Sequence, residues 1–249
     1  MRKILIIGIG AGDPDHLTVQ AIRALNRADV LFIPDKGEEK ADLRRLRTEI
    51  CERFIERAGY RTVGYVVPRR GEAGEDYRGS VADWHARLVA AHSAMIEREL
   101  QDGQCGAFLV WGDPAFYDST LRIIERIVAG GLPLDYEVIP GISAIQALAA
   151  RHRIALNRIG EPVLVTTGRR LADSPDTDAV VMLDGEQAFA RVAPDDLDIF
   201  WGAYLGTTDE ILIAGPLAEI RGEIERVRKQ AREAKGWIMD TYLIRRRDS

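Results

Sequence analysis

The chain is poor in cysteine and histidine, on which many metal sites and covalent catalytic sites depend. It has two cysteines, Cys51 and Cys105, which lie far apart in the sequence, and four histidines. Neither a Gly-x-Ser-x-Gly nor a His-Glu-x-x-His sequence occurs, so hydrolysis by a serine nucleophile or a zinc ion has no support. We expect no metal site, and free buried thiols in a reducing cytoplasm.

Long hydrophobic runs and a strong excess of one charge are also missing. No apolar stretch approaches the roughly 20 residues that a membrane-spanning helix needs. The net charge is −5, which provides no basic field for nucleic acid or for an anionic membrane. The 249 residues, of which 46% are hydrophobic, are typical of a globular protein with one large domain or two small ones.

Short apolar runs alternate with helical patterns, which predicts an α/β fold. In the first half we expect strands at 3–10, 29–34, 61–67 and 106–111, helices at 19–28, 41–58 and 81–102, and a polar loop at 68–80. Pro34 is expected to end the second strand. In the second half strands outnumber helices, and 198–217 indicates two antiparallel strands. The sequence therefore predicts two α/β domains, 1–131 with a mostly parallel sheet and 134–249 with a mixed sheet.

The sequence GIGAGD at 8–13 follows the first predicted strand and precedes the first helix, where a dinucleotide-binding fingerprint would lie. That fingerprint requires a glycine three positions after Gly10, and Asp13 stands there instead. Its carboxylate would face a pyrophosphate, which is electrostatically unfavourable. A nucleotide-binding oxidoreductase therefore stays only an alternative, although the glycines indicate that main chain closely approaches a ligand or another part of the protein.

Glycine, proline and small residues follow five predicted strands. They occur in GIGAGD, in WGDP at 111–114, in IPGISA at 139–144, in TTG at 166–168 and in LDG at 183–185. Asp113 could simply cap a helix that has Pro114 in its first turn, and Ser143 is placed to cap another. Because ligands of open α/β sheets lie outside the carboxyl ends of the strands, the recurrence favours a ligand held mainly by backbone groups.

The histidines and arginines outside these loops leave alternatives open. His85 and His92 lie seven residues apart and share a helix face, but no cysteine or carboxylate has metal spacing around them. This favours a packing or surface role over metal binding. Arg69, Arg70 and Arg78 belong to the polar loop, where they would either be solvated or bind carboxylates.

Several motifs occur together in the order and spacing of the tetrapyrrole methylases, which the chain resembles. They are GIGAGDPDHLTVQAIRALNRADVLF at 8–32, LVWGDPAFYDS at 109–119, VIPGISA at 138–144, VVM at 180–182 and EILIAGPL at 210–217. The resemblance extends over essentially the whole chain. It implies two α/β domains with S-adenosylmethionine (SAM) in a cleft between them, S-adenosylhomocysteine as product, a tetrapyrrole substrate and a homodimer.

A closer resemblance within that family implies a particular reaction. It depends on DKG at 35–37, TTGRRLA at 166–172, WGAYLGTTDEILIAG at 201–215 and GWIMDTYL at 236–243. The reaction is methylation of precorrin-5 at C-1, with release of the extruded acyl group as acetate. Another precorrin or uroporphyrinogen methylase of the same family stays the alternative.

The resemblance also assigns residues by position. Cofactor binding falls on Ala11, Trp111, Gly112, Asp113, Phe116, Ser143, Ala144, Met182, Ala214 and Gly215, although many family members have proline in place of Ala11. Asp113 would place negative charge near the cationic cofactor or cap the following turn. Methyl transfer needs alignment and no protein nucleophile, whereas acyl loss needs water and a base. The candidates for the base are Asp13, Asp35, Tyr117 and Asp118, and those for binding the macrocycle carboxylates are Lys36, Arg69, Arg70 and Arg78.

Overall fold

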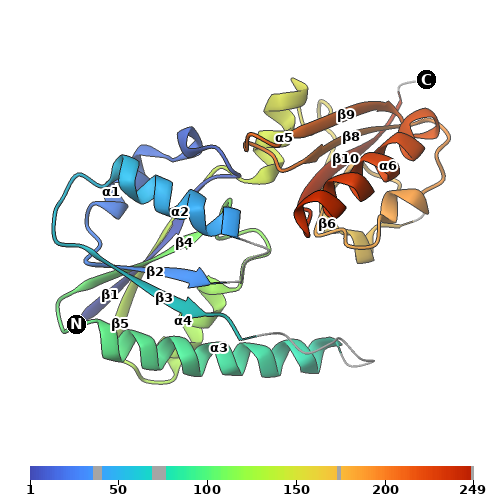
Figure 1. The fold of residues 1–249 in the computed structure, drawn as a ribbon. Helices are drawn as coiled ribbons and strands as arrows, with labels where there is room; N and C mark the ends of the chain where they lie inside the picture. The colour runs from blue at the N-terminus through green and yellow to red at the C-terminus, as the bar shows by residue number, and fades with distance from the viewer. Residues whose placement is uncertain (36–40, 69–76, 173–174, 248–249) are drawn as a thin grey trace. The chain divides into compact units, whose positions relative to one another are not determined.

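The computed structural model describes residues 1–35, 41–68, 77–172 and 175–247. The chain divides into two compact units. The N-terminal unit consists of Met1–Gly10 and Pro14–Ile142, and the C-terminal unit of Ala11–Asp13 and Ser143–Ser249. Each unit is an α/β layer structure with its own sheet (Figure 1), which confirms the predicted fold class.

The N-terminal unit is built on a parallel sheet of five strands in the order β3-β2-β4-β1-β5. The strands are β1 (Arg2–Gly8), β2 (Val30–Asp35), β3 (Arg61–Val66), β4 (Cys105–Val110) and β5 (Leu134–Ile139). Strand β1 lies between β4 and β5, and its apolar run from Ile4 to Ile7 is fully buried, as expected of parallel strands covered by helices on each side.

Helices cover both faces of this sheet (Figure 1). They are α1 (Val19–Leu25), α2 (Ala41–Phe54), α3 (Tyr77–Glu99) and α4 (Thr120–Ala129), with a short 3-10 turn at Pro14–His16. Alternate residues of β1 enter two separate cores: Leu5 and Ile7 pack with α1 and α2, while Ile4 and Ile6 pack with α3 and α4. Thr18 caps α1 as predicted, because its Oγ1 accepts a hydrogen bond from the Ala21 N–H.

The C-terminal unit contains a mixed sheet in the order β6-β7-β10-β8-β9. Its strands are β6 (Leu164–Thr167), β7 (Ala179–Met182), β8 (Leu197–Ala203), β9 (Ile211–Pro216) and β10 (Asp240–Arg246). Only the β6–β7 pair is parallel, and the predicted antiparallel pair β8–β9 is present. The helices of this unit are α5 (Ala144–His152) and α6 (Leu217–Lys235), with 3-10 turns at Gly168–Arg170 and Ala188–Ala190.

A hydrogen-bonded ion pair lies in the core under α6. Arg228 and Asp240 are almost fully buried, and Arg228 Nε donates to Asp240 Oδ2 at 2.9 Å. Trp201 Nε1 donates to the same oxygen at 3.0 Å. Burial raises the pKa of Asp240 against the opposing effect of Arg228, and the pair is tolerated because both groups are hydrogen-bonded.

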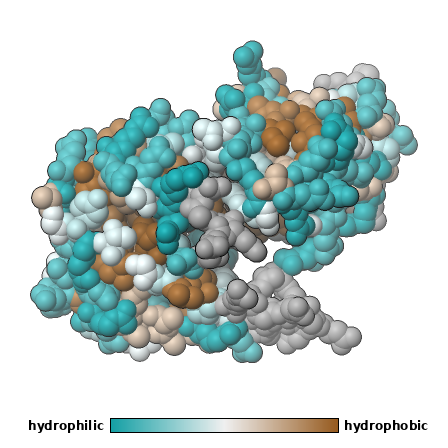
Figure 2. Space-filling view, in the orientation of Figure 1, coloured by the Kyte–Doolittle hydropathy of each residue, from teal (hydrophilic) through white to brown (hydrophobic). Residues whose placement is uncertain are grey.

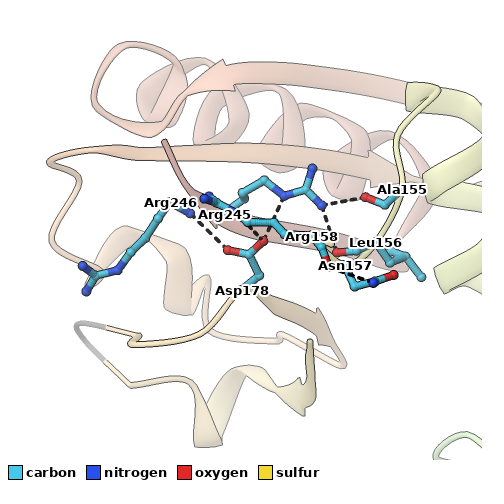
Figure 3. Close-up of polar contacts among 7 residues, drawn as sticks. All are labelled: Ala155, Leu156, Asn157, Arg158, Asp178, Arg245 and Arg246. Carbon is cyan, nitrogen blue, oxygen red and sulfur yellow. Dashed lines mark hydrogen bonds and ion pairs between the residues drawn. The ribbon is translucent and has the colours of Figure 1, made fainter. Parts of the chain in front are cut away.

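A second polar centre lies at Asp178, directly before β7 (Figure 3). Its Oδ2 accepts hydrogen bonds from Arg245 Nε at 3.0 Å and Arg158 Nε at 3.3 Å, and its Oδ1 from the Arg246 N–H at 3.3 Å. Arg245 also donates to the carbonyls of Ala155 and Leu156. Asp178 thereby fixes the segment after α5 to strands β7 and β10.

The face drawn in Figure 2 is largely hydrophilic, and hydrophobic residues reach it in separate patches on both units. Some large apolar side chains are well exposed, among them Val66 on β3 and Leu164 on β6, each of which belongs to a strand at a sheet edge. Within the described ranges, no helix is both long and apolar enough to span a bilayer.

Three sequence predictions need correction. The predicted domain boundary at 131–134 is wrong, because β5 pairs in parallel with β1 and so belongs to the N-terminal sheet. Pro34 does not end the second strand: it lies within β2, where only β3 continues the pairing beyond Phe32, so its missing N–H costs no bond to β4. The long helix begins at Tyr77 rather than at 81.

We predict that Asp178→Asn destabilises the C-terminal unit by about 2–3 kcal/mol, because a neutral amide replaces the buried carboxylate that pairs with two arginines and keeps only one of its acceptor oxygens. Asp198→Asn is the matched control, since Asp198 pairs with Arg247 at 2.9 Å but is 32% exposed, and it should cost at most about 1 kcal/mol. Urea denaturation followed by circular dichroism measures both. Equal midpoints for the two variants would show that the Asp178 centre contributes no more than a surface pair.

Candidate active site

The carboxyl ends of β4, β1 and β5 lie at the point of the sheet where the chain stops adding strands on one side and begins to add them on the other. The helix after β1 packs on one face of the sheet and the helix after β4 on the other, although β1 and β4 are neighbours. Open α/β sheets bind ligands outside the carboxyl ends of the strands at such a switch point. The loops that follow β1 and β4 therefore occupy the expected ligand position of the N-terminal unit.

Glycines bring the main chains of these three strand ends into contact. Gly10 and Gly112 form an isolated antiparallel bridge, in which Gly112 N–H donates to Gly10 O at 2.8 Å. A Cβ on Gly141 would lie 2.2 Å from Gly112 O, and one on Gly8 would lie 2.6 Å from Gly141 N. Gly112 also has a φ of 70°, which favours glycine. The glycines that follow these strands are therefore explained by close contact between loops of the protein.

Asp113 connects the loop after β4 to the loop after β5. Its Oδ2 accepts a hydrogen bond from Gly141 N–H at 2.8 Å, and its Oδ1 accepts one from Ala115 N–H at 2.7 Å. It does not cap α4, whose first residue is Thr120. Of the two roles predicted for Asp113, the structure shows the capping of the turn that follows it.

A cavity of about 260 Å³ opens beside this loop inside the N-terminal unit. Two predicted catalytic residues, Tyr117 and Asp118, line it together with the predicted cofactor residue Trp111. Tyr117 is 42% exposed and has a φ of 52°, a left-handed conformation that costs a non-glycine residue about 1–2 kcal/mol. The loop after β4 is thus held in a strained shape where it borders the cavity.

Two polar residues that the sequence did not single out, Arg47 on α2 and Tyr65 on β3, also line the cavity, together with His92 on α3. Arg47 is 5% exposed, and its Nε and Nη1 donate to the carbonyls of Leu109 and Leu43 at 3.1 and 2.8 Å. Burial lowers the pKa of Arg47 and raises that of Tyr65. The sequence did indicate that Arg47 faces the core, since it lies on the same helix face as the predicted apolar residues Leu43 and Ile50.

His92 is a buried, neutral residue of this wall. Its Nδ1 donates to the Leu88 carbonyl at 2.7 Å, and burial lowers the pKa of its imidazole. Its ring packs against Tyr65 at 5.0 Å and Phe108 at 5.2 Å, which fixes the Tyr65 ring. The other predicted histidine, His85, lies at hydrogen-bond distance, 3.0 Å, from Ser119 Oγ.

The remaining base candidates lie elsewhere. Asp35 ends β2 and forms an ion pair with Arg44 at 3.7 Å, and it does not line the cavity of Asp118. Asp13 and the buried Ala11 group with the C-terminal unit. Lys36, Arg69 and Arg70 lie outside the described residues. Arg78 lies in α3, but its side chain is not described.

In the C-terminal unit the predicted cofactor residues lie on three elements. Ser143 caps α5 in a capping box with Gln146, so its hydroxyl is already hydrogen-bonded. Met182 ends β7, and Ala214 and Gly215 lie on β9. Three strand spacings separate β7 from β9 in the sheet, or about 14 Å. Met182 and Ala214 would therefore contact different parts of a ligand.

Potential metal ligands and the two cysteine thiols give no further candidate site among the residues that the structure describes. Among the described residues, no cluster of three or more His, Cys, Asp or Glu side chains could hold a metal ion. Cys51 and Cys105 are free, and burial raises the pKa of their thiols to about 12 and about 11. Both are therefore protonated, unreactive thiols at neutral pH.

Comparison with known proteins identifies the class. Residues 3–221 match the family model of the tetrapyrrole (corrin/porphyrin) methylases, and the chain belongs to this family. The match confirms the resemblance seen in the sequence and decides against a nucleotide-binding oxidoreductase.

Two individual proteins of this class are similar to the chain over nearly its whole length. The chain is 56% identical to a precorrin-6A synthase (deacetylating) of a Sinorhizobium species, over 99% of this chain and 96% of that protein. A solved structure from Corynebacterium diphtheriae, named as a cobalamin synthesis related protein (CobF), is 40% identical and superposes with a TM-score of 0.85 over 100% of both chains.

A more distant structure shares only the fold. A uroporphyrin-III C-methyltransferase of Thermus thermophilus, solved in complex with S-adenosyl homocysteine, is 17% identical. The alignment covers 97% of this chain and 91% of that one, with a TM-score of 0.53.

We predict that Asp113→Asn destabilises the N-terminal unit by about 1–3 kcal/mol, because an amide can replace only one of the two carboxylate oxygens that accept N–H bonds. The control is Asp135→Asn on β5, whose exposed carboxylate lies 3.6 Å from Lys3, with an expected change within about 0.5 kcal/mol. Chemical denaturation measures both. If stability is unchanged and only SAM affinity falls, Asp113 acts through its charge instead.

We predict that the stability of the N-terminal unit falls as the pH drops below about 6.5, the ordinary pKa of histidine. The buried His92 has a lowered pKa, so in this range the unfolded chain binds a proton that the folded chain does not, and stability rises with pH. One such histidine contributes a slope of at most about 1.4 kcal/mol per pH unit. Urea denaturation between pH 7 and 5 should show a shallower slope for His92→Gln; parallel curves would contradict the assignment to His92.

Proposed function

We propose that this chain is a SAM-dependent C-methyltransferase that methylates precorrin-5 at C-1 and releases the extruded acyl group as acetate, giving precorrin-6A. The observation that carries the proposal is the 56% identity to the Sinorhizobium precorrin-6A synthase, which extends over 99% of the chain. The 40% identity to the Corynebacterium protein over the full length of both chains adds support.

The N-terminal residues fit a cofactor that carries no phosphate. The strand ends at the switch point present a main-chain bridge between Gly10 and Gly112, next to the half-buried rings of Trp111 and Phe116. A carboxylate, Asp113, stands in the same loop, and its charge suits a cationic sulfonium. When bound there, SAM would supply an electrophilic methyl group, and these residues would hold and align it.

The C-terminal residues would contribute mainly apolar contacts. Met182 and Ala214 lie on the sheet face opposite the Val181 and Ile213 side chains, which pack in the core under α6. Leu183, which follows Met182, is 56% exposed and has a φ of 53°. As at Tyr117, an unfavourable backbone conformation occurs next to a predicted ligand-binding residue.

A homodimer and a cytoplasmic location are part of the proposal. The homodimer rests on the family resemblance, and the cytoplasmic location rests on the two unpaired cysteines. Binding of the macrocycle carboxylates by Lys36, Arg69, Arg70 and Arg78 likewise stays a prediction.

The wild-type chain should bind SAM and S-adenosylhomocysteine in calorimetry, with affinities that EDTA does not change, and should not bind NAD. Turnover of precorrin-5 should release one acetate for each S-adenosylhomocysteine, because both products come from the same macrocycle. Chromatography of the quenched reaction measures the ratio. Methyl transfer to another precorrin without acetate would assign the chain to a different member of the family.

A further inference from the structure

The cavity of the N-terminal unit has a composition that the methyl transfer does not explain. Its walls include apolar side chains such as Phe32, Leu88 and Phe108, together with the polar groups of Arg47, Tyr65 and Asp118. Its volume, about 260 Å³, is below the about 300–1,000 Å³ of sites for drug-sized ligands. It can take a small group and a water molecule, and a whole macrocycle is too large for it.

Arg47 contributes a buried cation to this cavity, on which the Asp118 carboxylate of the same lining acts electrostatically. Two of its five N–H groups are bonded to carbonyl oxygens. Within the described residues, no carboxylate is recorded within ion-pair distance of its guanidinium. A buried charge without a close counter-ion is costly, and a small anion in the cavity would remove that cost.

Asp118 provides a carboxylate with one oxygen already fixed. Its Oδ1 accepts the Thr120 N–H at 2.7 Å, and for Oδ2 no hydrogen bond is recorded in the described part of the chain. Asp118, Arg47 and Tyr65 all line this one cavity, and both charged groups act electrostatically on Tyr65. The ring contacts of Tyr65 with His92 and Phe108 hold the phenol in place.

We propose that this cavity receives the acyl group of the macrocycle and is the site of its hydrolysis, with Asp118 as the base and Arg47 and Tyr65 as the groups that stabilise the oxyanion. This inference rests on the proposed function and assigns its acyl-release step to named residues. Tyr117, the 42%-exposed residue of the lining, marks the side from which the acyl group enters.

The step balances without any further reagent. Asp118 takes a proton from water, and the hydroxide oxygen bonds to the acyl carbonyl carbon. The oxyanion that forms is stabilised by the Arg47 guanidinium and the Tyr65 hydroxyl. The bond between the acyl carbon and the ring then breaks, and its electron pair stays on the conjugated ring for the proposed methylation. Acetic acid leaves the ring and gives its proton to bulk water, so acetate remains beside Arg47.

The charges of the cavity favour this assignment. Before the step the site holds one carboxylate and one guanidinium. After it, Asp118 carries a proton and acetate is the anion that faces Arg47. The cavity itself therefore holds one anion and one cation at both stages, and the negative charge of the released electron pair is delocalised over the ring, which limits the electrostatic cost of the step inside the cavity.

A purely structural role for Arg47, joining α2 to β4 through Leu43 and Leu109, is the competing interpretation. Two mild variants separate the interpretations, because neither touches these carbonyl bonds. Tyr65→Phe removes one hydroxyl, and Asp118→Asn keeps an acceptor for the Thr120 N–H. Tyr136→Phe on β5, whose side chain also packs in the core shared with α3 and α4, is the matched control.

Single-turnover reactions with precorrin-5 and SAM should follow acetate and S-adenosylhomocysteine separately. We expect Asp118→Asn to slow acetate release by about 10²–10⁴-fold and Tyr65→Phe by about 10²-fold, with SAM binding unchanged and Tyr136→Phe equal to wild type. Wild-type acetate rates in both variants would overturn the inference and leave the proposed function intact. A wild-type chain that releases no acetate would instead refute the proposed function.

Binding of the product gives a readout that needs no turnover. Carbon-13-labelled acetate should show line broadening in NMR with the wild-type chain, and the broadening should disappear with Arg47→Gln. Arg47→Lys, which keeps the charge, should retain part of it, and circular dichroism checks that both variants are folded. Equal broadening for wild type and folded Arg47→Gln would overturn the role of Arg47.

Discussion

Three main chains meet without side chains between them at the carboxyl edge of the N-terminal sheet. A Cβ on Gly141 would lie only 2.2 Å from Gly112 O, and a Cβ on Gly8 would lie 2.9 Å from the same oxygen. Only glycine permits this approach. Because the loops after β1, β4 and β5 are fixed against one another here, Asp113 can reach Gly141 N–H, and the rest of the loop after β4 starts from a defined position.

The loop after β4 then carries two kinds of surface. Its first residues, Gly112 and Asp113, have their polar groups bonded to the neighbouring loops. Its last residues, Tyr117 and Asp118, border a cavity that contains a buried cation. Apolar side chains form part of the lining around Arg47, and electrostatic interactions of a buried group are stronger than those in bulk water. Within this loop, a few residues thus separate the main-chain contacts at Gly112 and Asp113 from the charged cavity at Tyr117 and Asp118.

Local patterns predicted the elements and missed the long-range contacts. Thr18 and Ser143 were identified as helix caps because capping depends on residues within one turn, and β8–β9 because a short turn joins the two strands. The domain boundary was wrong because β5 pairs with β1, more than a hundred residues earlier, and a Gly-Gly turn before β5 is equally compatible with one domain or two. Arg47 was overlooked because Arg44 and Arg45 stand beside it, and only its helix-face position distinguishes it from them.

The proposed chemistry gives the two surfaces of this loop different tasks. Methyl transfer requires a cofactor held in line without competing nucleophiles, and bonded main chain at Gly112 provides contacts that do not react. Acyl hydrolysis requires a base and a cation in a protected space, which Asp118 and Arg47 provide. If acyl loss leaves its electron pair on the ring, the two tasks must follow closely on one macrocycle, since the released pair would otherwise take a proton from water. Carrying both surfaces on one fixed loop keeps their spacing constant, and the glycine contact between β1, β4 and β5 is what fixes that loop.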